Sequence, residues 1–299
     1  TGSRQETLSG LLSLPKEKSF NPFQLTMELV SIIIPCYNHA MFIEETLRSA
    51  LASTYSPIEI IIINDGSTDN SEEIAQKYSR EFPNIFYISQ TNQGPAAARN
   101  NGIRSAKGKY ILPLDADDRI SNDYIEKAVT VLSNNLDVKL VYCEAEFFGE
   151  RTGKWNLPSF SRKYLARENL IFPTAMYRKS DWEKTGGYDE RMTWGWEDWE
   201  YWISLLKDGG EVVKLPITGF FYRVRKGSRR KSTNREAKRK TVALINEKHL
   251  DFEKKYLHGP LHINRSWSAT INKIVNFTRS IWHEGSHYRR RRFHWQSAA

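Results

Sequence analysis

Two near-continuous runs of β-branched residues, LVSIIIPCYN from Leu29 and IEIIIIN from Ile58, constrain the fold most. Strands of this kind are buried on both faces, as in the centre of a parallel sheet covered by helices on both sides. A helical pattern follows each run, and two further strand–helix units continue the alternation to residue 135. The four alternations predict a doubly wound, mostly parallel α/β sheet, extended by a strand at 138–148 and a helix-like segment between residues 174 and 186.

Acidic residues gather where one of these strands ends. The stretch KYILPLDADDRI, residues 109–120, runs from a buried strand directly into Asp115, Asp117 and Asp118. The carboxyl ends of strands in an open α/β sheet border the crevice where such folds bind ligands, and acids two residues apart can share a divalent cation there. Capping of the next helix is the other role open to such acids, and Asp118 is the expected cap.

The second strand also ends on a carboxylate, Asp65 of the segment NDGSTD. An Asx turn with Gly66 explains this pattern as well as ligand binding does. The chain has no G-x-G-x-x-G after its first strand and no G-x-x-x-x-G-K-[ST] segment. These absences argue against dinucleotide-binding dehydrogenases and P-loop nucleotidases.

The segment MTWGWEDWEYWISLLKDGG, residues 192–210, combines acids with tryptophans. Its apolar spacing predicts a helix with one buried face. That face consists of Trp199, Trp202, Ile203 and Leu206. Glu197 and Asp198 stand at the helix start, where the helix dipole favours anions, and Trp194 and Trp196 precede them in a loop. Core tryptophans with capping acids are one interpretation, but paired acids beside loop aromatics favour polyol recognition and proton abstraction.

The net charge of +9 is unevenly distributed along the 299 residues. Residues 29–219 carry 21 basic and 27 acidic side chains, whereas residues 220–299 carry 20 basic and five acidic ones, a net charge of +15. The predicted organisation is a flexible lead-in over 1–28, an α/β domain over 29–222 with halves at 29–120 and 121–222, and a basic, largely helical extension over 223–299. A nucleic-acid-binding protein would spread its basic charge over the binding face, so an anionic membrane surface is the favoured partner of the extension.

The two cysteines, Cys36 and Cys143, lie within apolar strand-like runs. We interpret both as reduced core residues in a reducing compartment. No apolar run approaches the roughly 18–20 residues that a membrane-spanning helix needs, and no charged-then-apolar segment opens the chain. A soluble or peripheral protein is expected.

Five segments, taken together and in order, resemble the motifs of a family 2 glycosyltransferase of the GT-A fold. They are VSIIIPCYN, IIIINDGSTD, NQGPAAARNNGIRSAKGKYILPLDADD, TGGYDE and WGWED, and the resemblance extends from about residue 29 to residue 225. It implies transfer of a sugar from a nucleoside-diphosphate donor, usually UDP-linked, with inversion at the anomeric carbon. It also implies Mn²⁺ or Mg²⁺ as the cofactor and a glycan or lipid-linked saccharide as the acceptor.

The resemblance assigns roles to individual residues. The nucleotide-sugar would be bound by Pro35, Tyr37, Asn38, Asp65, Arg99, Asp115 and Ala116. Among these, Tyr37 would stack on the base and Asp65 would accept from the uracil imide N–H. The metal would be bound directly by Asp117, with Asp115 contacting the ribose or a metal-bound water. In the acceptor half, Asp198 would be the general base, Glu197 its companion, and Trp194 and Trp196 an apolar platform for the acceptor ring.

The sequence departs from the family pattern in two places. Relatives often carry a His after the Y-R pair that completes the metal site, whereas FFYRVRKGS has Arg225 and Lys226, cations that can contact the diphosphate and loosen metal dependence. No Q-x-x-R-W motif appears and no membrane spans follow, so transfer of a single sugar is favoured over processive synthesis. A non-catalytic nucleotide- or carbohydrate-binding module on the same fold is the alternative.

The basic extension allows several interpretations. Residues 223–240 contain ten Lys or Arg and one acid, a pattern that suits a mobile lid over the diphosphate or a solvated helix face. Between residues 267 and 282 an apolar stripe recurs at helical spacing, and four arginines follow at 289–292. Such a helix can lie in a membrane interface or pack on the catalytic domain. Membrane binding through residues 262–299 would place a cytoplasmic enzyme at the inner face of the plasma membrane.

Overall fold

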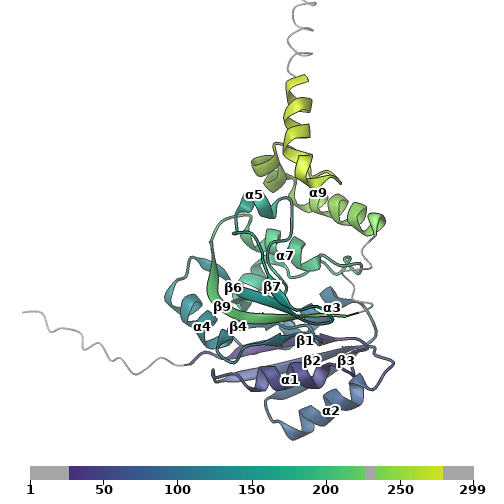
Figure 1. The fold of residues 1–299 in the computed structure, drawn as a ribbon, viewed down its shortest axis with the longest axis vertical. Helices are drawn as coiled ribbons and strands as arrows, with labels where there is room; N and C mark the ends of the chain where they lie inside the picture. Colours follow the sequence, from purple (N-terminus) through teal and green to yellow (C-terminus); the bar gives the residue numbers. More distant parts are fainter. Residues whose placement is uncertain (1–26, 226–233, 279–299) are drawn as a thin grey trace, which may run out of the picture.

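The computed structural model describes residues 27–225 and 234–278 (Figure 1). In these residues nine strands form one sheet with the order β3-β2-β1-β4-β8-β6-β9-β5, and β7 pairs with β6 outside that path. The fold is the expected mixed α/β fold with a mostly parallel first half. The predicted lead-in at 1–28 lies outside the described residues except for its last two.

The first half is a parallel sheet built from the β-branched runs. Its strands are β1 (Val30–Cys36), β2 (Ile58–Asp65), β3 (Ile85–Gln90) and β4 (Tyr110–Pro113), which alternate with the helices α1 (Ile43–Leu51), α2 (Ser71–Glu81) and α3 (Pro95–Ser105). Strand β1 lies between β2 and β4 and is parallel to both. Every residue of β1 is buried, which confirms the position expected of a strand apolar on both faces.

The second half departs from simple alternation. Its elements are β5 (Arg119–Ile120), α4 (Tyr124–Asn134), β6 (Val138–Gly149), β7 (Gly153–Trp155), α5 (Arg162–Leu165), β8 (Met176–Arg178), α6 (Lys179–Thr185) and β9 (Glu211–Val224). The helix expected to close on Gly186 is present as α6, with Gly186 as its C-cap, but residues 176–178 before it form β8, which pairs antiparallel with β4 and β6. Three residues are too short for a strand to show its period of two, which explains why β8 was not predicted.

Helix α7 (Glu197–Leu206) is buried on all sides. Among its ten residues only Ser204 is partly exposed, so the prediction of a single buried face was wrong. The reason is that α5 and α6 pack on α7, and so does α9 (Arg235–Leu257) of the basic extension (Figure 1). Across this interface the buried Glu200 carboxylate lies 2.7 Å from His249 Nε2 and 2.7 Å from Lys248 Nζ. At least this part of the extension therefore packs on the catalytic domain.

Beyond α9 the chain forms the short 3₁₀ helix η1 (Arg265–Trp267) and a helix that continues to residue 278. That C-terminal helix extends away from the body of the molecule (Figure 1). Trp267, Ile274 and Phe277 are 59%, 59% and 66% exposed. None of the helices in the described ranges is long and apolar enough to cross a membrane. Both cysteines are free and buried, as expected.

Candidate active site

The candidate site is built at the carboxyl ends of β1, β2 and β4, which are neighbours in the sheet. Because neighbouring parallel strands end at the same edge, residues after them share one side of the sheet. Pro35 lies within β1 and is buried, whereas Tyr37, just beyond the strand, is 43% exposed. The ring of Tyr37 is therefore open to a ligand. Ala116, fully buried in the loop after β4, contributes backbone to the same edge.

Asp65 is 3% exposed and organises the loop that precedes α3. Its Oδ1 accepts hydrogen bonds from Gln90 Nε2 at 2.8 Å and from the Gln93 N–H at 2.9 Å, and its Oδ2 accepts from the Gly94 N–H at 2.9 Å. Gly94 has φ of 87°, a left-handed conformation that side chains disfavour. One lone pair of Oδ2 remains for a ligand N–H, so the expected contact with uracil is compatible with this structural role.

Asn38 shapes the neighbouring loop after β1. It has φ of 57°, and its side-chain oxygen accepts from the Thr68 N–H at 2.7 Å. Its own backbone N–H donates to Ser67 Oγ at 3.0 Å. These bonds tie the loops after β1 and β2 together, which fixes the position of Tyr37 beside Asp65.

Arg99 is the central charge of the site, and it is 2% exposed. Its Nη2 donates to Asp115 Oδ1 at 2.6 Å, and its Nη1 donates to Glu197 Oε1 at 2.6 Å. One guanidinium thus joins the acidic strand end to the start of α7, although 82 residues separate Asp115 from Glu197 in the chain. Arg99 thus holds these two acids in position, and its expected place near the donor stays a prediction.

Asp198 lies beside this bridge and is 8% exposed. Its Oδ2 accepts from Asn169 Nδ2 at 2.7 Å, and its Oδ1 accepts from the Trp199 N–H at 2.9 Å. Burial, followed by the negative charge of Glu197, raises the pKa of Asp198 to about 7, against the lowering effects of Arg99 and Asn169. A carboxylate with a pKa near neutrality is well suited to accept a proton from a hydroxyl.

Asp117 faces a cation supplied by the chain itself. Its Oδ2 accepts from Arg225 Nε at 2.9 Å, and it lies 3.7 Å from His39 Nε2. Burial lowers the pKa of His39, which favours its neutral ring. That ring can accept a hydrogen bond from Arg225, whose Nη2 is 2.7 Å from His39 Nε2, in addition to the bond that Arg225 donates to Asp117. Arg225 therefore occupies the place next to Asp117 where a metal ion would sit. Lys226 lies outside the described residues.

The residues around Asp117 offer few protein ligands to a divalent ion. Across residues 27–225 and 234–278, no three His, Cys, Asp or Glu side chains are grouped to hold one. A Mg²⁺ ion in a nucleotide site commonly takes one or two carboxylates and completes its shell with water and substrate phosphates. Asp117 fits such an ion, with Asp115 nearby as the second acid of the pair, provided that Arg225 moves aside.

The expectation that Asp118 caps a helix is wrong. Its Oδ1 accepts from the Arg223 N–H of β9 at 2.8 Å, and its backbone oxygen accepts from Thr46 Oγ1 at 2.8 Å. Asp123 occupies the N-cap position of α4 instead. Asp118 is 2% exposed, and burial raises its pKa well above the usual range. It fastens β9, and with it Arg225, to the acidic loop.

The expected acceptor platform is contacted by the basic extension. Trp194 Nε1 donates to Thr241 Oγ1 of α9 at 2.8 Å, and Lys240 Nζ lies 5.6 Å from the centre of the Trp194 ring. The guanidinium of Arg265 lies 5.9 Å from the ring of Trp196. Both tryptophans remain partly exposed. The extension thus forms part of the surroundings of the loop where an acceptor is expected.

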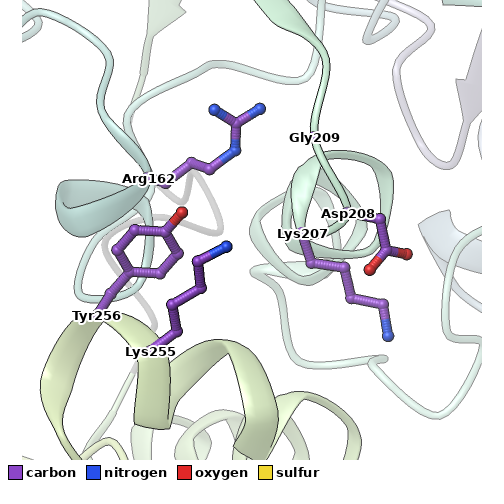
Figure 2. Close-up of a pocket in the computed structure, with 6 residues that line it drawn as sticks. All are labelled: Arg162, Lys207, Asp208, Gly209, Lys255 and Tyr256. Atoms are coloured by element: carbon purple, nitrogen blue, oxygen red, sulfur yellow. The ribbon is translucent and has the colours of Figure 1, made fainter.

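A pocket of about 400 Å³ lies at the opposite end of α7 (Figure 2). It is lined by Arg162, Lys207, Asp208, Gly209, Lys255 and Tyr256. Arg162 donates to the backbone oxygens of Leu206 and Gly210, which compensates the unpaired carbonyl groups where α7 ends. Since α7 has ten residues, this pocket is roughly 15 Å from the acids at its start. None of the residues predicted to act in the site lines it.

Several contacts were not anticipated from the sequence. His39 directly follows Asn38 in the loop after β1, and this position is the one signal that could have drawn attention to it. Asn169 lies in an irregular segment with no motif around it. Thr241 and Lys240 are two residues within a highly basic stretch. Their roles depend on packing between segments far apart in the chain.

Residues 31–200, more than half of the chain, match the family model described as Glycosyl transferase family 2. The chain belongs to this glycosyltransferase family. This glycosyltransferase is 41% identical over 167 residues to the uncharacterized glycosyltransferase YibD of Escherichia coli, which covers 55% of this chain and 45% of YibD. It is also 31% identical over 199 residues to a chondroitin synthase of Escherichia coli, covering 65% of this chain and 29% of that protein. The chain therefore spans less than half the length of both relatives.

Solved structures of related fold have donors bound. This glycosyltransferase superposes on TarS of S. aureus in complex with UDP-GlcNAc with a TM-score of 0.65 and 20% identity, over 81% of this chain and 73% of that one. The mannosyltransferase PcManGT of Pyrobaculum calidifontis, in complex with GDP-Man and Mn²⁺, gives a TM-score of 0.60 at 19% identity, over 84% and 75% of the two chains. At these identities the likeness shows the shared fold.

Proposed function

We propose that this glycosyltransferase moves a single sugar from a UDP-linked hexose or N-acetylhexosamine to a hydroxyl of a glycan or lipid-linked saccharide, with inversion at the anomeric carbon. The donor would lie over Tyr37 and Asp65 at the edge of the parallel sheet. The acceptor would enter beside Trp194 and Trp196. Displacement would be direct, with the acceptor oxygen attacking the carbon from which the diphosphate departs.

The observation that carries this proposal is the bridge through Arg99. Its guanidinium bonds Asp115 on the donor side and Glu197 on the acceptor side, both at 2.6 Å. Asp198, the neighbour of Glu197, is therefore held close to the donor edge. A direct displacement needs a base and a leaving group on opposite sides of one carbon, and this bridge supplies the fixed spacing.

Asp198 has the properties of a general base. With a pKa of about 7 it is ionised in much of the population at neutral pH, yet it binds a proton more strongly than an exposed acid does. Each of its oxygens accepts one hydrogen bond from the protein, which leaves lone pairs for the acceptor hydroxyl. As the hydroxyl oxygen attacks, its proton would pass to this carboxylate.

We propose Mn²⁺ or Mg²⁺ as the cofactor, held by Asp117 with Asp115 beside it. A bound divalent ion supplies Lewis-acid stabilisation of the charge on a departing diphosphate. The residues of the chain provide the anionic surface that selects a cation at this edge. Arg225 and the neutral His39 complete the surroundings of Asp117.

The proposed activity can be tested with a panel of UDP- and GDP-sugars, by measuring release of UDP or GDP with and without simple sugar acceptors. We expect this release to increase when one particular donor is combined with one particular acceptor. The anomeric configuration of the product, determined by NMR, would test inversion. Donor binding with no release for any pair would favour the alternative, a non-catalytic binding module.

Removal of the Asn169 amide is expected to move the pH dependence of transfer. The hydrogen bond from Asn169 to Asp198 lowers the pKa of that carboxyl, so Asn169→Ala should raise it above its value of about 7. Transfer requires the ionised form, and the acid limb of kcat/KM against pH should therefore shift by about one pH unit toward alkaline pH. An unchanged limb would contradict the role of Asp198 as base. Asn276→Ala, at an exposed asparagine bonded to the His258 carbonyl, is the control.

We further propose that the C-terminal helix associates with anionic membrane lipids at the inner face of the plasma membrane, in the cytoplasm. Its support is the exposed apolar set of Trp267, at the end of η1, and Ile274 and Phe277, on the helix that extends from the body (Figure 1), together with the basic charge of the extension. The four arginines at 289–292 lie outside the described residues. The part of the extension in α9 is excluded from this role because it packs on α7.

Exchange of Trp267 and Ile274 for Ser is expected to weaken binding to vesicles of phosphatidylglycerol and phosphatidylcholine by about tenfold or more, since buried apolar side chains contribute most of the insertion energy. Co-sedimentation at low and high salt would measure this. Leu136→Ser is the matched control, because Leu136 is 78% exposed on the body of the molecule. Equal vesicle binding by all three proteins would end the membrane proposal.

A further inference from the structure

Arg225 differs from the other arginine at the end of β9. Arg223 is fixed: its backbone N–H bonds Asp118, its Nε donates to the Asp117 backbone oxygen at 2.8 Å, and its guanidinium pairs with Glu45. Arg225 follows the strand, and its guanidinium bonds Asp117 and His39 and lies 5.2 Å from the centre of the Phe42 ring. Its side chain is 28% exposed, compared with 12% for Arg223. The Arg225 side chain can therefore leave its partners without disturbing the sheet.

The contacts of Arg225 place it in competition with any cation at Asp117. Its Nε donates to Asp117 Oδ2 at 2.9 Å, so it uses one of the two lone pairs of an oxygen that a metal ion would need. A divalent ion there would also meet a guanidinium of the same charge sign. Without Arg225, the carboxylates of Asp115 and Asp117 would share the loop with less compensation of their negative charge.

A diphosphate offers Arg225 better partners than it has now. Guanidinium groups bind phosphate oxygens with two parallel charge-assisted hydrogen bonds, whereas Arg225 now makes one bond to Asp117 and one to His39. Exchange of these partners requires rotation of one side chain that is already partly solvated. The Arg225 guanidinium can thus pair with Asp117 in the empty site and with a diphosphate in the occupied one.

We propose that Arg225 is a resident counter-ion of the donor site that neutralises Asp117 when the site is empty, competes with divalent ions for it, and transfers to the diphosphate when the donor binds. This inference rests on the proposed donor site. It gives a role to the arginine that stands where relatives often carry a metal-binding His: its positive charge would pair with Asp117 in the empty site and with the diphosphate in the occupied one.

The test compares Arg225→Gln with the unaltered protein in two binding measurements that do not depend on activity. Free Mn²⁺, followed by electron paramagnetic resonance without nucleotide, should bind the variant about three- to tenfold more tightly, because a competing charge is gone. UDP, titrated calorimetrically in EDTA, should bind the variant about tenfold or more weakly, because charge-assisted bonds to phosphate are lost. Uridine, which has no phosphate, should bind both proteins equally.

Arg104→Gln is the matched control, since Arg104 pairs with Glu190 at the surface and is 58% exposed. It should leave all three ligands unaffected. Mn²⁺ affinity that is unchanged or lower in Arg225→Gln, or UDP affinity in EDTA that is unchanged, would overturn the inference. Absence of UDP binding by the unaltered protein, with or without Mn²⁺, would instead overturn the proposed function on which it rests.

Discussion

Replacement of Asp198 by Asn is expected to lower sugar transfer by about 10²–10⁴-fold while UDP binding stays within about twofold, because the general base is lost and the donor edge is intact. Asn keeps an oxygen that can accept the hydrogen bond from Asn169, which is 2.7 Å in the present structure. Transfer rates and calorimetric UDP titration would measure the two effects. Asp208→Asn, at an exposed acid near the other end of α7, is the control and should change neither.

The same variant should be more stable than the parent at alkaline pH. The pKa of Asp198 is raised in the folded state from its ordinary 3.8 to about 7, so its contribution to stability is fully present below pH 3.8 and is lost as pH rises through 7. Asn does not ionise and avoids that loss. Thermal unfolding at pH 8 should therefore show a higher Tm for Asp198→Asn. A lower Tm would contradict the effect of burial on this acid, and transfer that survives would contradict its catalytic role.

Replacement of Arg99 by Met is expected to lower the free energy of unfolding by about 3–5 kcal/mol, because it leaves Glu197 and Asp115 without their cation. Glu197 is 7% exposed in its side chain and contributes most of the penalty, whereas Asp115, at 31%, can be partly solvated. Chemical denaturation would measure the loss. Arg104→Gln, which breaks an exposed pair, should cost about 0–1 kcal/mol.

A second substitution separates loss of this charge pair from general damage to the core. Adding Glu197→Gln to Arg99→Met removes the uncompensated buried acid and should restore part of the stability, which a double-mutant cycle would quantify. Transfer should remain low in both variants, because Asp198 loses its fixed position relative to Asp115. Full activity in Arg99→Met would show that the two halves of the site are positioned by other contacts.

The parallel half of the fold was predictable because its strands carry a local signal. Seven consecutive residues of β1 are buried, and their β-branched character is visible without any tertiary information. Strand β9 gave no such signal, since Pro216 and Gly219 interrupt it and usually break strands. In the structure the pairing of β6 with β9 shifts register between Leu215 and Thr218, which accommodates the proline.

The acidic residues of the candidate site were predictable from the sequence, but the residues that they contact were not. Asp115, Asp117 and Asp198 stand at element ends, where a motif can be recognised one segment at a time. The burial of Arg99 and the pairing of Arg225 with Asp117 depend on how distant segments pack, and a sequence pattern does not encode that packing. The prediction of a single buried face for α7 failed for the same reason, since α5, α6 and the distant α9 all cover it.

The dependence of α7 on α9 also orders events during protein synthesis. Glu200 of α7 pairs with His249 and Lys248, which are synthesised about 50 residues later. While the nascent chain is still emerging from the ribosome, the parallel half of the sheet can fold as soon as its strands are available, but α7 still lacks these partners. A ribosome that stalled before residue 248 would hold a chain in which the buried Glu200 carboxylate has neither of them.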